Sequence, residues 1–134
     1  MKIRNGIDMV QISRIARYSD EDNKAFLDKC FTKDEQEYCM SLSPKLRAES
    51  FAARFAAKEA AAKALGTGIC TKGIGFLSFE VVRDEEGAPK LVFHGNALDE
   101  ARRIGVISVS LSLSHEKEYA IAACTLLTNE EESI

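Results

Sequence analysis

Apolar and polar residues alternate along the last third of the chain, which is the pattern of β-strands. Between residues 107 and 114 every apolar residue is followed by a serine, and this period of two predicts a strand with one apolar face. Residues 119–127 are apolar on both faces, as expected for a central strand that is covered on both sides. A further strand is predicted over residues 2–10, with Ile7 on one face and Asp8 on the other.

The region before residue 66 instead predicts helices. The longest is expected over residues 45–65, a stretch without glycine or proline and rich in alanine, with Gly66 as its stop. Thr32 followed by Glu35 has the spacing of a capping box, so another helix should begin just after Thr32. The other expected elements are helices from about residue 11, over 22–30 and over 96–104, and a hairpin of strands 76–83 and 90–94 around a turn at 84–87.

These elements predict one α+β domain with its helices early and most of its strands late. The domain is expected to span residues 1–127, followed by an acidic tail at 128–134 that should be solvated and frayed. With 134 residues, of which 46% are hydrophobic, the chain has enough apolar surface for one core. The small size makes a site shared between subunits plausible for a nucleotide-sized ligand.

Composition and charge exclude several classes of function. The net charge of −3 argues against general nucleic-acid binding, because basic side chains are not in surplus. The four cysteines show no C-x-x-C spacing, so neither a disulfide framework nor a zinc site is expected. Asp8 interrupts what would be the apolar core of a signal peptide, and no apolar run could cross a bilayer. We therefore expect a cytoplasmic protein that binds neither nucleic acid nor membranes.

Asp8 is the first candidate for chemistry. An aspartate inside a first strand, two residues after Gly6, is disfavoured unless it is paired or binds a metal. The alternative is that Asp8 caps the following helix.

A group of charged residues on the long helix is the second candidate. Glu59 and Lys63 are four residues apart and share a face, as do Arg54 and Lys58. These charges could simply belong to a solvated helix. The alanines around them, however, would let another strand or subunit pack closely and would leave room for a ligand.

The third candidate is the end of the serine-rich strand. Ser114 and His115 suit phosphate recognition through hydrogen bonds, although a polar strand edge with a solvent-facing histidine would look the same. A nucleophilic Ser–His pair is disfavoured, since adjacent strand residues point to opposite faces.

Taken together, these segments resemble the holo-acyl-carrier-protein synthase family, the short trimeric branch of the 4′-phosphopantetheinyl transferases. The resemblance covers nearly the whole chain to about residue 127. It rests on GIDMVQISRI at 6–15, FTKDEQEYC at 31–39, RFAAKEAAAKALGTGI at 54–69, EVVRDEEGAPKLVFHG at 80–95 and SLSLSHEKEYAIAA at 110–123. It implies an antiparallel sheet packed against a long helix, in a homotrimer with active sites at the subunit interfaces.

The resemblance also implies a reaction, in which phosphopantetheine moves from coenzyme A to a serine of apo acyl carrier protein, and adenosine 3′,5′-bisphosphate leaves. Asp8 and Glu59 would bind Mg²⁺, for which Mn²⁺ could substitute, and Lys63 would lie near the leaving phosphate. The catalytic residues would thus be Asp8, Glu59 and Lys63. The general base is Glu59 or a water; the sequence leaves both open.

Further residues are assigned to the two substrates. By the resemblance, coenzyme A would be bound by Arg54, Lys58, Lys63, Gly66, Ser114 and His115. Arg14 matches a family arginine that contacts the acidic carrier protein, and Arg17 is added on charge alone. Two alternatives remain: a non-catalytic module that binds carrier protein, and a small nucleotide-binding or nucleic-acid-binding module. The first would be favoured by loss of the catalytic residues, and the second by a basic surface.

Overall fold

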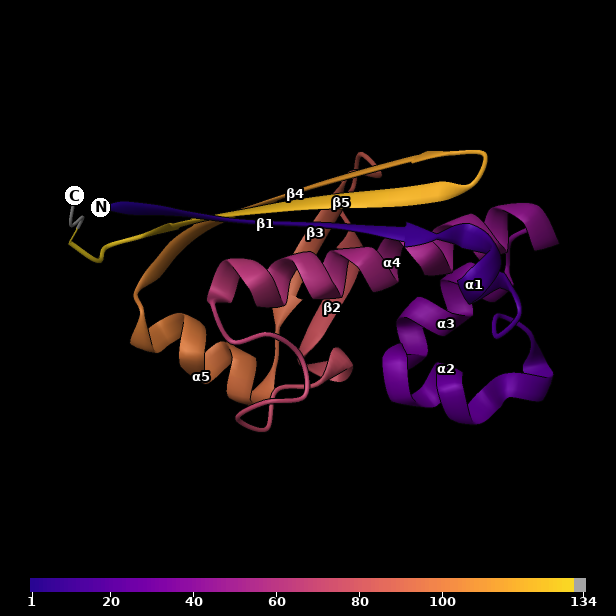
Figure 1. Ribbon diagram of the computed structural model, residues 1–134, viewed down its shortest axis with the longest axis horizontal. Helices are drawn as coiled ribbons and strands as arrows, with labels where there is room; N and C mark the ends of the chain where they lie inside the picture. Colours follow the sequence, from indigo (N-terminus) through magenta and orange to yellow (C-terminus); the bar gives the residue numbers. More distant parts are fainter. Residues whose placement is uncertain (132–134) are drawn as a thin grey trace.

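The computed structural model describes residues 1–131 and has the expected α+β architecture (Figure 1). Its helices and strands follow one another along the chain as β1 (Lys2–Gln11), α1 (Ile12–Ala16), α2 (Lys24–Cys30), α3 (Lys33–Met40), α4 (Pro44–Leu65), β2 (Phe79–Arg83), β3 (Pro89–Phe93), α5 (Gly95–Arg103), β4 (Val106–Glu116) and β5 (Tyr119–Thr128).

The three long strands form an antiparallel sheet in the order β1-β5-β4, so the apolar strand β5 is central as predicted. Strands β2 and β3 form a separate antiparallel hairpin. Helix α4 runs along one side of the long sheet, while α1, α2 and α3 gather at one end of the molecule and α5 lies toward the other (Figure 1). The long sheet and α4 thus form the two layers that position the candidate site.

The described part of the chain covers only one face of the long sheet. Gly6 and Val10 on β1 point toward α4 and are buried, whereas Ile7 is 63% exposed on the opposite face. On β5, Ala120 is buried and Ile121 is exposed in the same alternating manner. The prediction that residues 119–127 form a strand covered on both sides is therefore wrong for the single chain, because its second apolar face meets solvent.

Helix α4 forms the centre of the core. From Phe51 to Leu65 all of its side chains are buried except those of Glu59 and Lys63. The helix ends where predicted, at Gly66, which adopts the left-handed conformation with φ 86°. The interpretation of α4 as a solvated helix is excluded, and its alanines do let a strand, β1, pack closely.

Several predicted boundaries shift by a few residues. The capping box of Thr32 and Glu35 is formed as expected. The segment Phe76–Ser78 is a 3₁₀ turn and not the start of a strand, because the backbone N–H groups of Ser78 and Phe79 donate to the carbonyls three residues earlier. A second 3₁₀ turn, Glu21–Asn23, precedes α2.

Residues 128 and 130 of the acidic tail are held against the fold, which corrects the expectation of a solvated segment from residue 128. Thr128 is the last residue of β5, and the Glu130 carboxylate accepts two hydrogen bonds from the Arg4 guanidinium, at 2.9 and 3.1 Å. Arg4 also donates to the carbonyls of Ala64 and Leu65 at the end of α4. Residues 132–134 lie outside the described part of the chain.

Candidate active site

Asp8, Glu59 and Lys63 come together where β1 crosses α4. The close approach depends on Gly6, because a Cβ built on this residue would lie 1.8 Å from the carbonyl oxygen of Ala60. Only glycine allows the strand to lie this near the helix backbone. Asp8 is two residues further along the same inner face, and it therefore lies beside Glu59 and Lys63.

Lys63 links the strand to the helix. Its ammonium donates to the Ile7 carbonyl oxygen at 2.8 Å and to Asp8 Oδ1 at 3.2 Å. The Lys63 side chain is about half exposed, with 53% of its surface accessible, whereas that of Asp8 is 20% exposed. The ammonium is thus held at the rim of the site and can be reached by a ligand. Asp8, rather than Glu59, is the ion-pair partner of Lys63.

Glu59 is held in an unusual electrostatic environment. Partial burial raises the pKa of the Glu59 carboxyl, and the nearby negative charge of Asp8 raises this pKa further. The positive charges of Lys63 and Arg14 act in the opposite direction but do not cancel the rise. Two carboxylates that repel each other beside one lysine can accept a cation, or one of them can take up a proton.

A second group of predicted residues gathers further back along α4. Arg54 and His115 both line a hollow of about 270 Å³. His115 Nδ1 lies 3.2 Å from Glu49 Oε2, and Arg54 donates to Ser50 Oγ at 2.6 Å. The Arg54 side chain lies over the Tyr38 ring, 4.8 Å from its centroid, and its buried Nε has no hydrogen-bond partner among residues 1–131. This group suits an anionic ligand.

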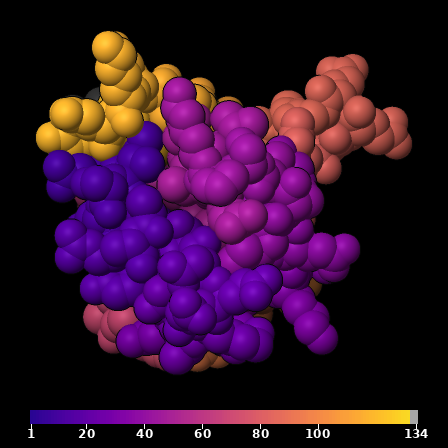
Figure 2. Space-filling model, turned by 90° about the vertical axis from the view of Figure 1, so that its right-hand side faces the viewer, coloured from indigo at the N-terminus to yellow at the C-terminus, as the bar shows by residue number. Residues whose placement is uncertain are grey.

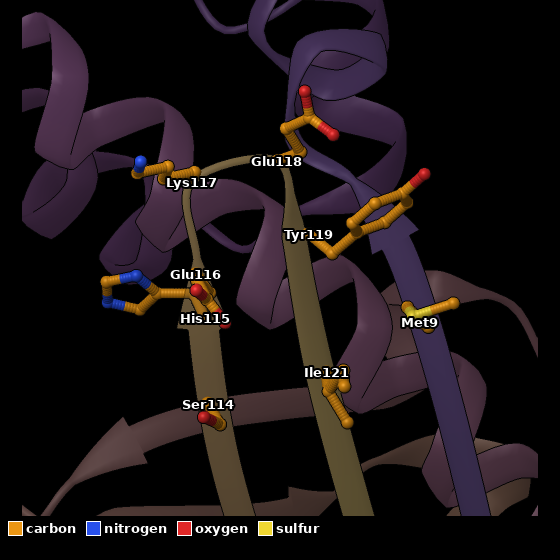
Figure 3. Close-up of a pocket in the computed structure, with 8 residues that line it drawn as sticks. All are labelled: Met9, Ser114, His115, Glu116, Lys117, Glu118, Tyr119 and Ile121. Atoms are coloured by element: carbon orange, nitrogen blue, oxygen red, sulfur yellow. The ribbon is translucent and has the colours of Figure 1, made fainter.

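Ser114 faces the other side of the sheet from His115, as the strand geometry predicted. It lies on the exposed face beside Ile121, while the His115 ring extends away from Met9 and Tyr119 (Figure 3). A hollow of about 420 Å³ lies at this end of the β4–β5 hairpin, lined by Met9, Ser114, His115, Glu116, Lys117, Glu118, Tyr119 and Ile121. The arrangement does not place Ser114 and His115 as a nucleophilic pair.

The two groups do not form one site within a single chain. Glu49 and Glu59 are ten residues apart on α4, which corresponds to about 15 Å along the helix axis. Arg54 and Glu59 are five residues apart, so their side chains leave the helix in directions that differ by about 140°. The carboxylates and the Arg54–His115 group therefore open toward different sides of the molecule.

Lys58 does not join either group. It is fully buried, and its ammonium donates to Glu35 Oε1 at 2.7 Å and to the carbonyls of Phe79 and Phe76 at 2.7 and 3.1 Å. With its three donors used inside the core, Lys58 has none left for a coenzyme A phosphate. The predicted contact is not available in this arrangement. The Lys58–Glu35 pair was not predicted from the sequence, because the capping box gives Glu35 one partner, Thr32, and does not indicate a second.

The remaining predicted residues lie at the surface around the carboxylates. Gly66 is exposed at the end of α4, one turn beyond Lys63. Arg14 and Arg17 are both exposed on or just after α1, and Arg14 lies over the Phe55 ring at 5.9 Å from its centroid. In Figure 2 the N-terminal helices form one broad face of the molecule, next to the tip of the β4–β5 hairpin.

No group of three or more His, Cys, Asp or Glu side chains within residues 1–131 is arranged to hold a metal by itself. A cation at Asp8 and Glu59 would therefore need ligands from elsewhere. All four cysteines, which lie in the described part, are free thiols. Over the same residues, no helix is both long and apolar enough to cross a membrane.

Comparisons with known proteins identify the family and the fold of the chain. The family model of the 4′-phosphopantetheinyl transferase superfamily matches residues 4–124. The chain therefore belongs to this superfamily. It is 48% identical, over 91% of its own length and 95% of the relative's, to a holo-[acyl-carrier-protein] synthase of Carboxydothermus hydrogenoformans.

Solved structures carry the same fold. A holo-(acyl-carrier-protein) synthase of Bacillus anthracis in complex with CoA (3′,5′-ADP) is 36% identical with a TM-score of 0.74, covering 92% of this chain and 94% of that one. The Helicobacter pylori holo-[acyl-carrier-protein] synthase in complex with coenzyme A is 30% identical with a TM-score of 0.78, covering 92% and 99%.

Proposed function

We propose that this chain is a holo-[acyl-carrier-protein] synthase, which transfers 4′-phosphopantetheine from coenzyme A to a serine of apo acyl carrier protein. The observation that carries the proposal is the meeting of Asp8, Glu59 and Lys63 at one point, in a chain of this superfamily. A non-catalytic binding module would have no need to hold two carboxylates and a lysine together. The acidic composition continues to disfavour a nucleic-acid-binding module.

The donor set fits Mg²⁺, with Mn²⁺ as a substitute. Both Asp8 and Glu59 offer carboxylate oxygens, which hard divalent cations prefer, and their mutual repulsion would be relieved by a cation. The pair leaves most of the coordination shell free, as expected when substrate phosphates supply further oxygens. A bound cation would neutralise charge on the pyrophosphate of coenzyme A as its phosphoanhydride bond breaks.

Lys63 would act on the leaving group of the reaction, and Glu59 would act on the attacking serine. The half-exposed Lys63 ammonium could turn from Asp8 to the departing adenosine 3′,5′-bisphosphate and stabilise its charge. Glu59, whose pKa is raised by partial burial and by Asp8, is a stronger base than an ordinary carboxylate. It would take the proton of the attacking carrier serine directly or through a water.

We infer that the complete site is shared between neighbouring copies in a homotrimer. Within one chain the Asp8–Glu59 group is separated from the Arg54–His115 group, and this separation supports the inference. The Arg54–His115 group would then face the nucleotide end of a coenzyme A molecule bound to a neighbouring copy. The exposed apolar face of the sheet supports the same inference, since such faces commonly mark contact surfaces. It carries Ile3, Ile7, Met9, Ile107, Tyr119 and Ile121. Ser114 on this face and Gly66 near Lys63 stay assigned to coenzyme A.

The carrier protein would dock on the α1 face. Arg14 and Arg17 are exposed there, and Arg14 is also close enough to Glu59 to influence its charge. An acidic carrier would be steered to these arginines and would bring its serine toward the carboxylates. We propose a cytoplasmic location, where coenzyme A and apo carrier protein would be available.

Mass spectrometry tests the proposal. The purified chain is incubated with apo acyl carrier protein, coenzyme A and Mg²⁺, and the carrier is weighed. We expect the carrier to gain the mass of one phosphopantetheine, and this gain to disappear when Mg²⁺ is chelated. A carrier of unchanged mass under the full conditions would remove the enzyme from consideration.

A further inference from the structure

Lys58 is the most deeply buried charged side chain among the described residues, with 0% of its surface exposed. Its partner Glu35 is 2% exposed and accepts two further hydrogen bonds, from the backbone N–H of Thr32 and of Val81, both at 2.9 Å. Together with the bonds of Lys58 to the Phe76 and Phe79 carbonyls, the pair joins α3, α4, β2 and the 3₁₀ turn before β2.

Apolar packing specifies the rotation of α4 about its own axis only weakly in the second half of the helix. Phe51 and Phe55 pack on other aromatic rings, but from residue 56 to residue 65 the helix is buried on almost every side and every buried apolar side chain except that of Leu65 is alanine. Small, similar side chains offer few distinctive contacts, so several rotations would bury nearly the same area. A buried ammonium selects one rotation, because any other would leave it without its partners.

The rotation of α4 determines the directions in which residues 58, 59 and 60 point. Successive helix residues are turned by about 100°, so Lys58 and Ala60 point to opposite sides of α4. Ala60 packs on Gly6 of β1, and Lys58 reaches Glu35 on the far side. Glu59 lies between them and is the only one of the three that is not buried. Its carboxylate is thereby presented beside Asp8.

We propose that Lys58 and Glu35 are positioning residues, whose buried pair sets the rotation of α4 and so holds Glu59 opposite Asp8 for a divalent cation. Neither residue touches substrate. The proposal rests on the proposed function, because it takes Asp8 and Glu59 as the cation ligands. The proposal also gives two lysines of α4 different roles. Lys63 faces the site, whereas Lys58 orients the helix that carries Lys63.

The positioning role can be tested without turnover by measuring how tightly the chain binds Mn²⁺ in the presence of coenzyme A. Binding is followed as the loss of the electron paramagnetic resonance signal of free Mn²⁺. The variant Glu35→Gln keeps the volume and one oxygen of the side chain. The double variant Glu35→Gln/Lys58→Met leaves no buried charge unpaired. We expect the half-saturating Mn²⁺ concentration to rise about tenfold or more in the double variant and about threefold in Glu35→Gln. The KM for coenzyme A should change far less than kcat.

Ile104→Ala is the control for general loss of stability, since Ile104 is 4% exposed and lies between α5 and β4. It should lower the melting temperature without changing Mn²⁺ binding. If it weakens Mn²⁺ binding equally, or if both pair variants bind Mn²⁺ like the wild type, the positioning role is wrong. Should the double variant not fold, Glu35→Gln decides the question.

The outcomes that overturn the proposed function differ from those that overturn only the positioning role. A wild-type chain that neither binds Mn²⁺ with coenzyme A nor modifies the carrier overturns the function, and the positioning role with it. A wild-type chain that modifies the carrier, alongside pair variants with unaltered Mn²⁺ binding, overturns the positioning role alone.

Discussion

Gly6 packs directly on the backbone of Ala60, and this contact brings Asp8 to Glu59. A Cβ on Gly6 would lie 1.8 Å from the Ala60 carbonyl oxygen and 2.8 Å from the Ala64 backbone nitrogen. Because both atoms belong to the helix backbone, neither can move alone. The substitution Gly6→Ala must therefore push β1 away from α4.

We expect Gly6→Ala to destabilise the fold by about 1–3 kcal/mol or more and to weaken metal-dependent transfer. Urea unfolding and the carrier assay measure the two effects. Gly75→Ala is the matched control, because a Cβ there meets nothing within 4 Å and the backbone is extended. Equal stability of the two variants would show that the close packing at Gly6 is not required.

Arg14 is expected to serve carrier docking more than coenzyme A binding. Arg14→Ala should raise the KM for carrier protein about tenfold, the cost of one well-placed interfacial charge, and leave the KM for coenzyme A nearly unchanged. Steady-state kinetics with each substrate varied in turn provide the measurement. Lys90→Ala is the control, since Lys90 is an exposed lysine that lies on β3, not on the α1 face, and pairs with Asp84. A parallel loss of coenzyme A affinity in Arg14→Ala would rule out a pure docking role.

The pH dependence of the reaction should reflect Glu59. Because burial and Asp8 raise the pKa of Glu59, its proton is lost only above the pH at which an ordinary glutamate ionises. The acid limb of kcat/KM, measured at subsaturating Mg²⁺ so that Glu59 is free of metal, should therefore lie at higher pH than the usual glutamate range. Arg14 lowers the same pKa, so Arg14→Ala should move this limb to still higher pH. An unchanged limb in Arg14→Ala would contradict the coupling between the two residues.

The Arg4–Glu130 pair makes a separate prediction about stability. The Arg4 guanidinium, which donates two hydrogen bonds to the Glu130 carboxylate, lowers the pKa of that carboxyl to about 2. A lowered pKa means that the pair contributes fully above the unfolded value and loses its contribution as the pH falls toward about 2. Glu130→Gln should thus lower the melting temperature slightly at neutral pH and have no effect at the acid end. A constant difference across this range would show that the pair does not titrate as described.

The local elements of the fold could be predicted from the sequence because their signals are local. The capping box at Thr32, the glycine at the end of α4, and the serine alternation of β4 all involve neighbouring residues. The pairing of Asp8 with Glu59 could be predicted only through the family resemblance, since 51 residues separate them. The contact that permits it, Gly6 on Ala60, depends on the folded distance between strand and helix.

The role of Lys58 could not be predicted for a related reason. Lys58 and Lys63 belong to the same alanine-rich segment, and nothing in that segment tells which of them points inward. The answer depends on Glu35 on α3 and on two carbonyls of the segment before β2. The exposure of the outward face of β1 could not be predicted either. Apolar residues such as Ile7 would ordinarily be assigned to the core, but they are exposed in the single chain.

The central claim, that Asp8 and Glu59 hold one divalent cation against coenzyme A, is tested most directly by the metal dependence of carrier modification in two variants. Asp8→Ala and Glu59→Ala should each abolish Mg²⁺-dependent transfer while remaining folded, because either change would remove one of the two carboxylates proposed to bind the cation. Transfer at a near-normal rate by either folded variant, at the same Mg²⁺ concentration, would contradict the assignment.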